Sequence, residues 1–206
     1  MGRSNRAQAQ TNRQRIVDVA DAAFRKSGTQ AVTIAEVMTQ AGMTQGGFYK
    51  HFQSKDALVA EACASAFNRS AQTWKEKGLQ PDERVDGSLE RLIAYYFSEK
   101  PPEKTCPMVA LARDAEPHQA SQALNAAYQT GVEQLFETFT AIASEGQLKE
   151  ISRERLVLTF AAMVGANMLS RATGDKKWVK GVKQALFDKP SSQPPASPRS
   201  ERRRPK

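Results

Sequence analysis

Residues 33–52 read TIAEVMTQAGMTQGGFYKHF, and this stretch decides the fold. Thr33 with Glu36 forms a capping-box pattern, which predicts a short helix ending near residue 41. Gly42 then supplies a sharp turn, and a second short helix of two turns is expected over residues 45–52. Two short helices that meet at a glycine-containing turn are typical of a helix-turn-helix.

The second of these helices carries groups suited to DNA. A Gln amide pairs with an adenine edge, hydroxyl and imidazole groups donate to phosphate oxygens, and lysines supply charge. Gly46 and Gly47 cost a helix roughly 1 kcal/mol each relative to Ala, and they remove side chains where a helix would press closest to a groove. Taken singly, each residue also fits an ordinary protein surface, and it is the whole segment that favours DNA. The candidate DNA contacts are Thr33, Thr44, Gln45, Gly46, Tyr49, Lys50, His51 and Lys55.

Helices are expected on both sides of this pair. An apolar stripe predicts a first helix before it, and Gly28 is placed to end that helix in a left-handed cap. Ser54 opens a long helix that continues to about residue 77. The residues of the apolar stripe are Ile16, Val17, Ala20, Ala23 and Phe24.

About residues 13–67 resemble the DNA-binding domain of the TetR family of bacterial regulators. The motif residues that carry the resemblance are Thr33, Gly42, Tyr49, His51, Phe52, Ser54, Lys55 and Leu58. The resemblance implies a three-helix DNA-binding head, an all-helical body that binds a ligand and dimerises, and repression released by a small molecule. Gly47 departs from the Ser or Thr that often stands there, which puts one expected contact in doubt.

The rest of the chain also favours helices, because apolar residues recur at intervals of three and four and strand patterns are nearly absent. We therefore predict an all-α fold, a helix-turn-helix head on a helical-bundle body. The expected divisions are a basic arm at 1–12, the head at 13–67, the body at 68–188 and a disordered basic tail at 189–206. The body helices are expected at about 82–99, 108–115, 118–144, 152–172 and 176–187.

One body helix has a composition that suits self-association. Residues 160–169 mix large apolar side chains with Ala and Gly, which let another helix approach closely. Together with the last helix, which carries Trp178, Val182, Leu186 and Phe187, this segment is the candidate dimer interface. Packing within the same bundle is the alternative.

A ligand pocket is expected inside the body, lined by aromatic, Met and Leu side chains and one Cys. The same stripe is also typical of plain core. Cys106 precedes a predicted helix, where amide groups and Lys104 would lower the pKa of its thiol, and some electrophile-sensing members of the family are similar in placing a Cys there. An inert thiol is the alternative, and Cys63 is expected in the core. The candidate ligand residues are Tyr95, Tyr96, Cys106, Met108, Leu111, Tyr128, Phe136 and Met163.

The net charge of +8 is confined to the two ends of the chain. Residues 1–15 carry four Arg and no acid, and residues 189–206 carry six basic residues and one Glu, an arrangement that suits a polyanionic partner. We expect three partners: double-stranded DNA with a near-palindromic operator, a second copy of the chain, and a small-molecule effector.

Other classes of function fit the sequence less well. Only two His occur and no HExxH, paired CxxC, GxGxxG or Walker motif is present, so no enzyme, metal site or cofactor is expected. No secretory signal opens the chain, and the apolar stretch at 157–169 is too short to span a bilayer, so a soluble cytoplasmic protein is expected. A helical adaptor that docks protein partners through the basic tail is the remaining alternative.

Overall fold

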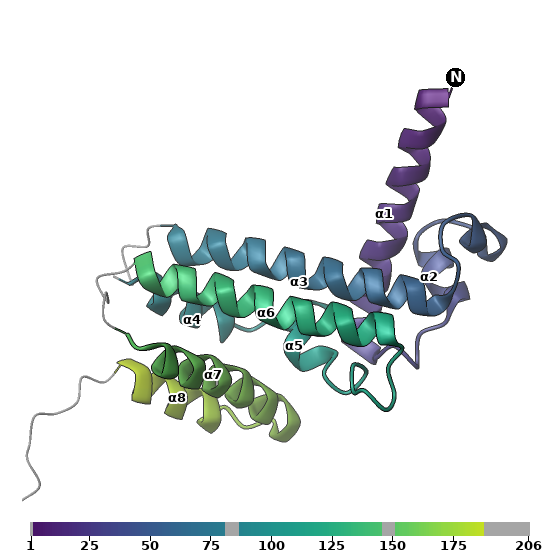
Figure 1. The fold of residues 1–206 in the computed structure, drawn as a ribbon. Helices are drawn as coiled ribbons and strands as arrows, with labels where there is room; N and C mark the ends of the chain where they lie inside the picture. Colours follow the sequence, from purple (N-terminus) through teal and green to yellow (C-terminus); the bar gives the residue numbers. More distant parts are fainter. Residues whose placement is uncertain (1, 81–86, 146–150, 188–206) are drawn as a thin grey trace, which may run out of the picture.

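The computed structural model describes residues 2–80, 87–145 and 151–187, and within these ranges all regular secondary structure is helical (Figure 1). The expected all-α fold is confirmed. The elements are α1 Gly2–Ser27, α2 Ile34–Gln40, the 3-10 helix η1 Gln45–Lys50, α3 Lys55–Leu79, α4 Ser88–Tyr96, the 3-10 helix η2 Pro102–Lys104, α5 Pro107–Ala110, α6 Gln122–Glu145, α7 Arg153–Thr173 and α8 Lys177–Phe187.

The head consists of α1, α2, η1 and the start of α3, which pack around aromatic and Met side chains. Phe24, Met38 and Phe48 are completely or almost completely buried there. Helix α1 begins at Gly2, so residues 2–12 of the expected basic arm continue this helix, and its N-terminal turns project away from the rest of the molecule (Figure 1). The expected tail, 189–206, lies outside the described residues.

The local patterns in the head produce the turns expected of them. Thr33 caps α2 in a complete capping box with Glu36. Gly28 and Gly42 have φ angles of +81° and +72°, in the left-handed region that a residue with a Cβ enters only at a cost. These three short-range features fix the path of the chain between α1, α2 and η1.

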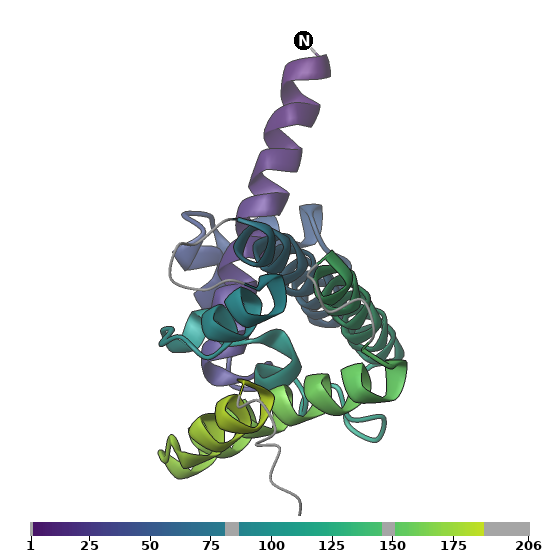
Figure 2. The same cartoon turned by 90° about the vertical axis from the view of Figure 1, so that its left-hand side faces the viewer.

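The body is built on α3 and α6, which lie side by side and run in the same direction (Figure 1). Gly131 allows their close approach, because a Cβ at this position would lie 2.2 Å from Cγ of Phe67. Helices α7 and α8 pack on each other and lie on the side of the body away from the N-terminus of α1 (Figure 2). Helix α3 starts in the head and ends in the body, and so connects the two.

Several body helices end or begin at other residues than expected: α4 ends at Tyr96 rather than near residue 99, and α6 begins at Gln122 rather than near residue 118. Helix α5 ends at Ala110 rather than near residue 115. Beyond its end, Asp114 accepts hydrogen bonds from the amide and the hydroxyl of Thr29, at 3.1 and 2.6 Å. Helix α7, Arg153–Thr173, agrees with the helix expected at about 152–172. It is longer than the apolar stretch 157–169, and by length and composition alone it could cross a membrane.

Candidate nucleic-acid interface and a cavity in the body

The second helix of the pair is a 3-10 helix, η1, and not the two-turn α-helix expected over 45–52. Gly46 and Gly47 explain the difference, because Gly has a low helix propensity and a short 3-10 segment satisfies the backbone in fewer residues. The Gly47 amide donates to the Thr44 carbonyl at 2.9 Å, and the Phe52 amide donates to the Phe48 carbonyl at 3.0 Å. Thr44 holds the N-cap position, but its side chain makes no capping hydrogen bond.

The candidate DNA contacts all reach the surface of the head. Tyr49 is the most prominent, with 72% of its side chain exposed. His51 and Lys55 are half-buried. The structure thus brings the candidates together on and beside η1, where their contact with DNA stays a prediction. The candidates that are exposed are Thr33, Thr44, Gln45, Gly46, Tyr49 and Lys50.

Buried aromatic rings support this surface from below. Phe48 is completely buried, and its ring stacks on that of Phe52 with centroids 5.6 Å apart. Tyr49 packs edge-on against Phe48, with centroids 5.2 Å apart. The exposed Tyr49 side chain is therefore held by a buried neighbour and does not itself contribute to the core.

Arg13 of α1 holds the end of η1 in place, a role that was not predicted from the sequence. Its guanidinium lies over the Phe52 ring, 4.1 Å from the centroid, and donates to the carbonyl of His51. It also forms an ion pair with Glu61 of α3. Because the partners are 38 and 48 residues away, no local pattern could have indicated Arg13.

Thr33 is committed to its capping box. Its hydroxyl donates to Glu36 Oε2 at 2.8 Å and accepts from the Glu36 amide at 3.2 Å. Glu36 also accepts from the Thr33 amide at 2.7 Å, and these bonds hold the pKa of the Glu36 carboxyl below its usual value. A phosphate contact from the Thr33 hydroxyl would have to replace its bond to Glu36.

The body contains a cavity of about 1080 Å³ between α1, α3, the segment from α4 to α5, α7 and α8. Three of the candidate ligand residues, Tyr95, Tyr96 and Cys106, line it. The other candidates lie elsewhere. Met108, Leu111 and Met163 are buried in the hydrophobic core, and Tyr128 and Phe136 pack against that core.

The structure gives Cys106 a different environment from the one expected. Burial raises the pKa of its half-buried thiol above the usual value, although Tyr96 and the amides of Met108 and Val109 act in the opposite direction. The expected lowering of the pKa of Cys106 is therefore wrong, since desolvation outweighs the nearby donors. Cys63 is buried in the core as expected, and burial raises the pKa of its thiol to about 12.

Comparison with known proteins identifies the head. Residues 16–62 match the family described as bacterial regulatory proteins, tetR family, and this range contains α2 and η1. The head of this chain is a DNA-binding domain of the TetR family. This is a family of transcriptional regulators with a DNA-binding helix-turn-helix, and not one of enzymes.

Individual TetR-family relatives agree with this assignment. The chain is 30% identical over 101 residues to the transcriptional regulator TtgR of Pseudomonas putida, a match that covers 48% of this chain and 47% of TtgR. It is 38% identical over 61 residues to AcrR of Shigella flexneri, covering 30% of this chain and 28% of AcrR. The chain thus spans less than half of the length of these two curated relatives.

Solved structures extend the similarity in fold to the body. The reduced form of E. coli NemR superposes with a TM-score of 0.71 at 16% identity, over 86% of this chain and 95% of that chain. A TetR regulator from Chloroflexus aurantiacus also gives a TM-score of 0.71, at 24% identity, over 87% and 94% of the two chains. The arrangement of head and body is therefore the TetR fold.

Proposed function

We propose that this TetR-family chain is a cytoplasmic, homodimeric repressor that binds a near-palindromic DNA operator and leaves it when a small molecule occupies the body. The observation that carries the DNA-binding part is the surface of η1, where Tyr49, Gln45 and Lys50 are exposed above the buried Phe48. Polar and basic side chains on a rigidly supported helix are what reading a major groove requires.

The proposed homodimer is supported by an apolar face on α7. Leu158, Met168 and Leu169 are large apolar side chains of α7 that are exposed, and Trp178 at the start of α8 is exposed as well. Small residues separate the large ones along α7, and a Cβ at Gly165 would meet no atom within 4 Å. An apolar face with a small-residue centre fits a second copy of the same helix pair, which buries it on both sides of a two-fold axis. Two heads would then be placed to enter successive major grooves, about 34–36 Å apart.

The decisive experiment for DNA binding compares Tyr49→Ala with the wild-type protein in the selection of fragments from the source genome. We expect the wild-type protein to enrich a short near-palindrome, and Tyr49→Ala to lose this enrichment. The exposure of Tyr49 means that its removal leaves the core intact. Tyr49→Phe is the matched control, because it keeps the ring against Phe48 and removes only the hydroxyl.

Two results would contradict the proposal. One is enrichment of DNA fragments that share no common sequence and whose binding weakens as salt rises. This result would mean that the head binds DNA only through its phosphates and not through its sequence. Association with proteins that is independent of DNA and of salt would favour the adaptor alternative instead.

The effector is proposed to bind without covalent attachment to Cys106. At neutral pH a thiol with a raised pKa is almost entirely protonated, and the thiolate is the reactive form. We expect Cys106 to react with N-ethylmaleimide more slowly than free cysteine, as measured by mass spectrometry over time. Faster labelling of Cys106, together with loss of DNA release by this electrophile in Cys106→Ser, would support the electrophile-sensing alternative.

A further inference from the structure

Among the charged side chains that line the cavity in the body, cations outnumber carboxylates. Among its described lining residues, Glu99 is the one carboxylate, and it pairs with Lys176 at the surface. The cationic side chains come from α1, α3, the segment between α4 and α5, α7 and the link between α7 and α8. They are Arg25, Arg69, Lys100, Lys104, Arg171 and Lys176.

Lys100 is a half-buried cation that no carboxylate pairs with in the described part of the chain. Its ammonium donates to the carbonyl oxygens of Tyr95 at 2.5 Å and Ser98 at 3.2 Å, and it lies 4.2 Å from the centroid of the Tyr95 ring. Burial lowers the pKa of Lys100 to about 8. Neutral carbonyls and a ring compensate a buried charge only in part, so an anion beside Lys100 would be stabilised.

Two buried hydroxyl groups in the wall of the same cavity could also donate hydrogen bonds to a ligand. Tyr96 and Thr105 are 4% and 3% exposed, and neither hydroxyl has a hydrogen-bond partner among the described residues. The Tyr96 hydroxyl lies close to the Cys106 thiol and to Asn167, but neither contact has the geometry of a full hydrogen bond. A buried hydroxyl without a partner costs stability, and an anionic oxygen would accept from it.

The wall of the same cavity also contains an apolar, aromatic part. Trp74, Tyr95, Tyr96 and Phe97 contribute aromatic rings to the cavity, and Trp74 and Tyr96 meet edge to face with centroids 5.6 Å apart. Aromatic walls with a few convergent polar groups are typical of sites for small organic ligands. A volume of about 1080 Å³ is ample for such a ligand.

We infer that the cavity binds a small aromatic anion, with its charged group among Lys100, Arg25 and the two buried hydroxyls and its ring against the aromatic wall. This inference names the chemical class of the effector and rests on the proposed role of the body. A planar Arg guanidinium can bind a carboxylate or a phosphate with two hydrogen bonds. The inferred ligand class therefore covers aromatic carboxylates and aromatic phosphates, which share an anionic group on a ring.

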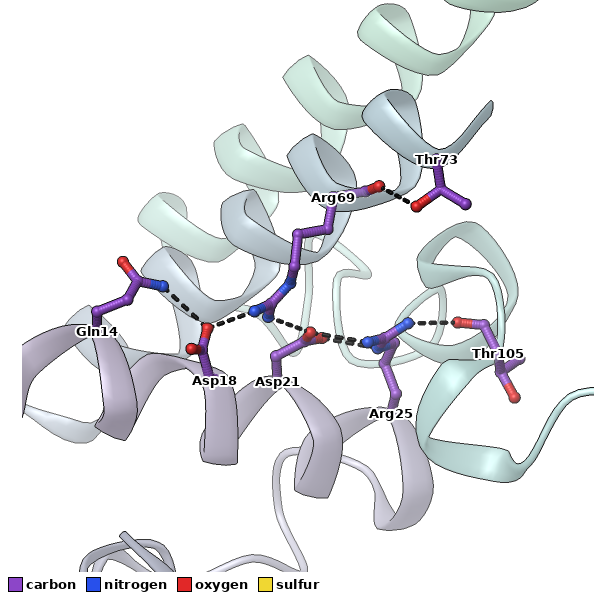
Figure 3. A network of polar contacts seen from close by, with 7 residues as sticks. All are labelled: Gln14, Asp18, Asp21, Arg25, Arg69, Thr73 and Thr105. Carbon is purple, nitrogen blue, oxygen red and sulfur yellow. Dashed lines mark hydrogen bonds and ion pairs between the residues drawn. The ribbon is translucent and has the colours of Figure 1, made fainter. Parts of the chain in front are cut away.

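The same cavity reaches the link between head and body. Figure 3 shows Arg25 of α1 and Arg69 of α3 meeting at Asp21, with Arg25 also donating to the carbonyl of Thr105 at 3.1 Å. Both guanidiniums line the cavity. An anion bound there competes with Asp21 for them and so weakens the ion pairs that join α1 to α3. Because α1 also holds η1 through Arg13, a shift of α1 changes the placement of η1.

The test is titration calorimetry on the full-length protein with benzoate, phenyl phosphate and benzamide. Benzamide has the shape of benzoate without its charge. We expect at least one of the anions to bind, and benzamide to bind about tenfold more weakly or not at all. A preference between benzoate and phenyl phosphate tells which charged group the site takes.

Variants locate the binding site in the cavity. Lys100→Met and Arg171→Met should each weaken anion binding, the first by about tenfold. Arg171 is exposed, so its replacement tests the cavity even if Lys100→Met impairs folding. Lys75→Met, which removes an exposed charge of α3 outside the cavity, should bind as the wild type does.

Three results would overturn the inference: equal affinity for benzamide, no binding of either anion at millimolar concentration, or an equal loss in Lys75→Met. The same preparation is assayed for selection of genomic DNA. If the protein binds the anion but selects no DNA sequence, the proposed repressor function is refuted and the anion site is supported. Selection of an operator without anion binding would refute the site alone.

Discussion

Replacing Asp21 by Asn is expected to destabilise the protein by about 3–5 kcal/mol, because it leaves two guanidiniums without their shared countercharge. The Asp21 side chain is 2% exposed. Its carboxylate forms an ion pair with Arg25 at 2.7 Å and another with Arg69. Burial raises the pKa of Asp21, and the two Arg act against this rise, so the carboxylate depends on both of them to remain ionised.

Urea unfolding followed by circular dichroism measures this loss, and Asp18→Asn is the matched control. Asp18 is one turn earlier on α1 and also pairs with Arg69, but its side chain is 46% exposed. Ion pairs at the surface contribute about 0–1 kcal/mol, so this variant should unfold close to the wild type. Equal midpoints for Asp21→Asn and the wild type would show that the buried cluster does not hold α1 on α3.

The head could be predicted from the sequence because short-range interactions determine it. The capping box of Thr33 and Glu36 and the left-handed Gly28 and Gly42 join residues no more than four positions apart, and the structure has each of them. The form of η1 was not predicted, since its two glycines favour a tighter helix than the motif suggests. The contacts that Arg13 and Asp21 make with α3 were missed for a different reason, because Glu61 and Arg69 each lie 48 residues away from them.

The cavity was predicted only in part, and the reason lies in what apolar periodicity reports. Such periodicity identifies the side chains that face other helices, and most of those fill space. Met108, Leu111 and Met163 are of this kind. A cavity forms where helices diverge, and long cations from several elements can reach into it. No pattern along one helix indicates that Arg25 and Lys100 line the same cavity.

Leu158→Lys is expected to convert the protein to a monomer and to lower its affinity for the operator by about 10²- to 10⁴-fold. Leu158 is 69% exposed, so a Lys at this position meets solvent in the monomer and is desolvated only in a dimer. Loss of the dimer removes the gain from binding two half-sites at once. Analytical ultracentrifugation measures the oligomeric state, and a fluorescence anisotropy titration measures operator binding.

Leu79→Lys separates this effect from a general loss of apolar surface. Leu79 is 41% exposed at the end of α3, away from the apolar face of α7, and its replacement should leave both the dimer and the affinity unchanged. The pair of variants also distinguishes two explanations of the apolar face of α7, namely a dimer interface and a membrane-entering helix. A helix that faces a second copy gives a wild-type dimer in detergent-free buffer, which Leu158→Lys dissociates. A helix that enters a membrane would instead require detergent for the wild type, and a single Lys would make the protein more soluble without changing a dimer.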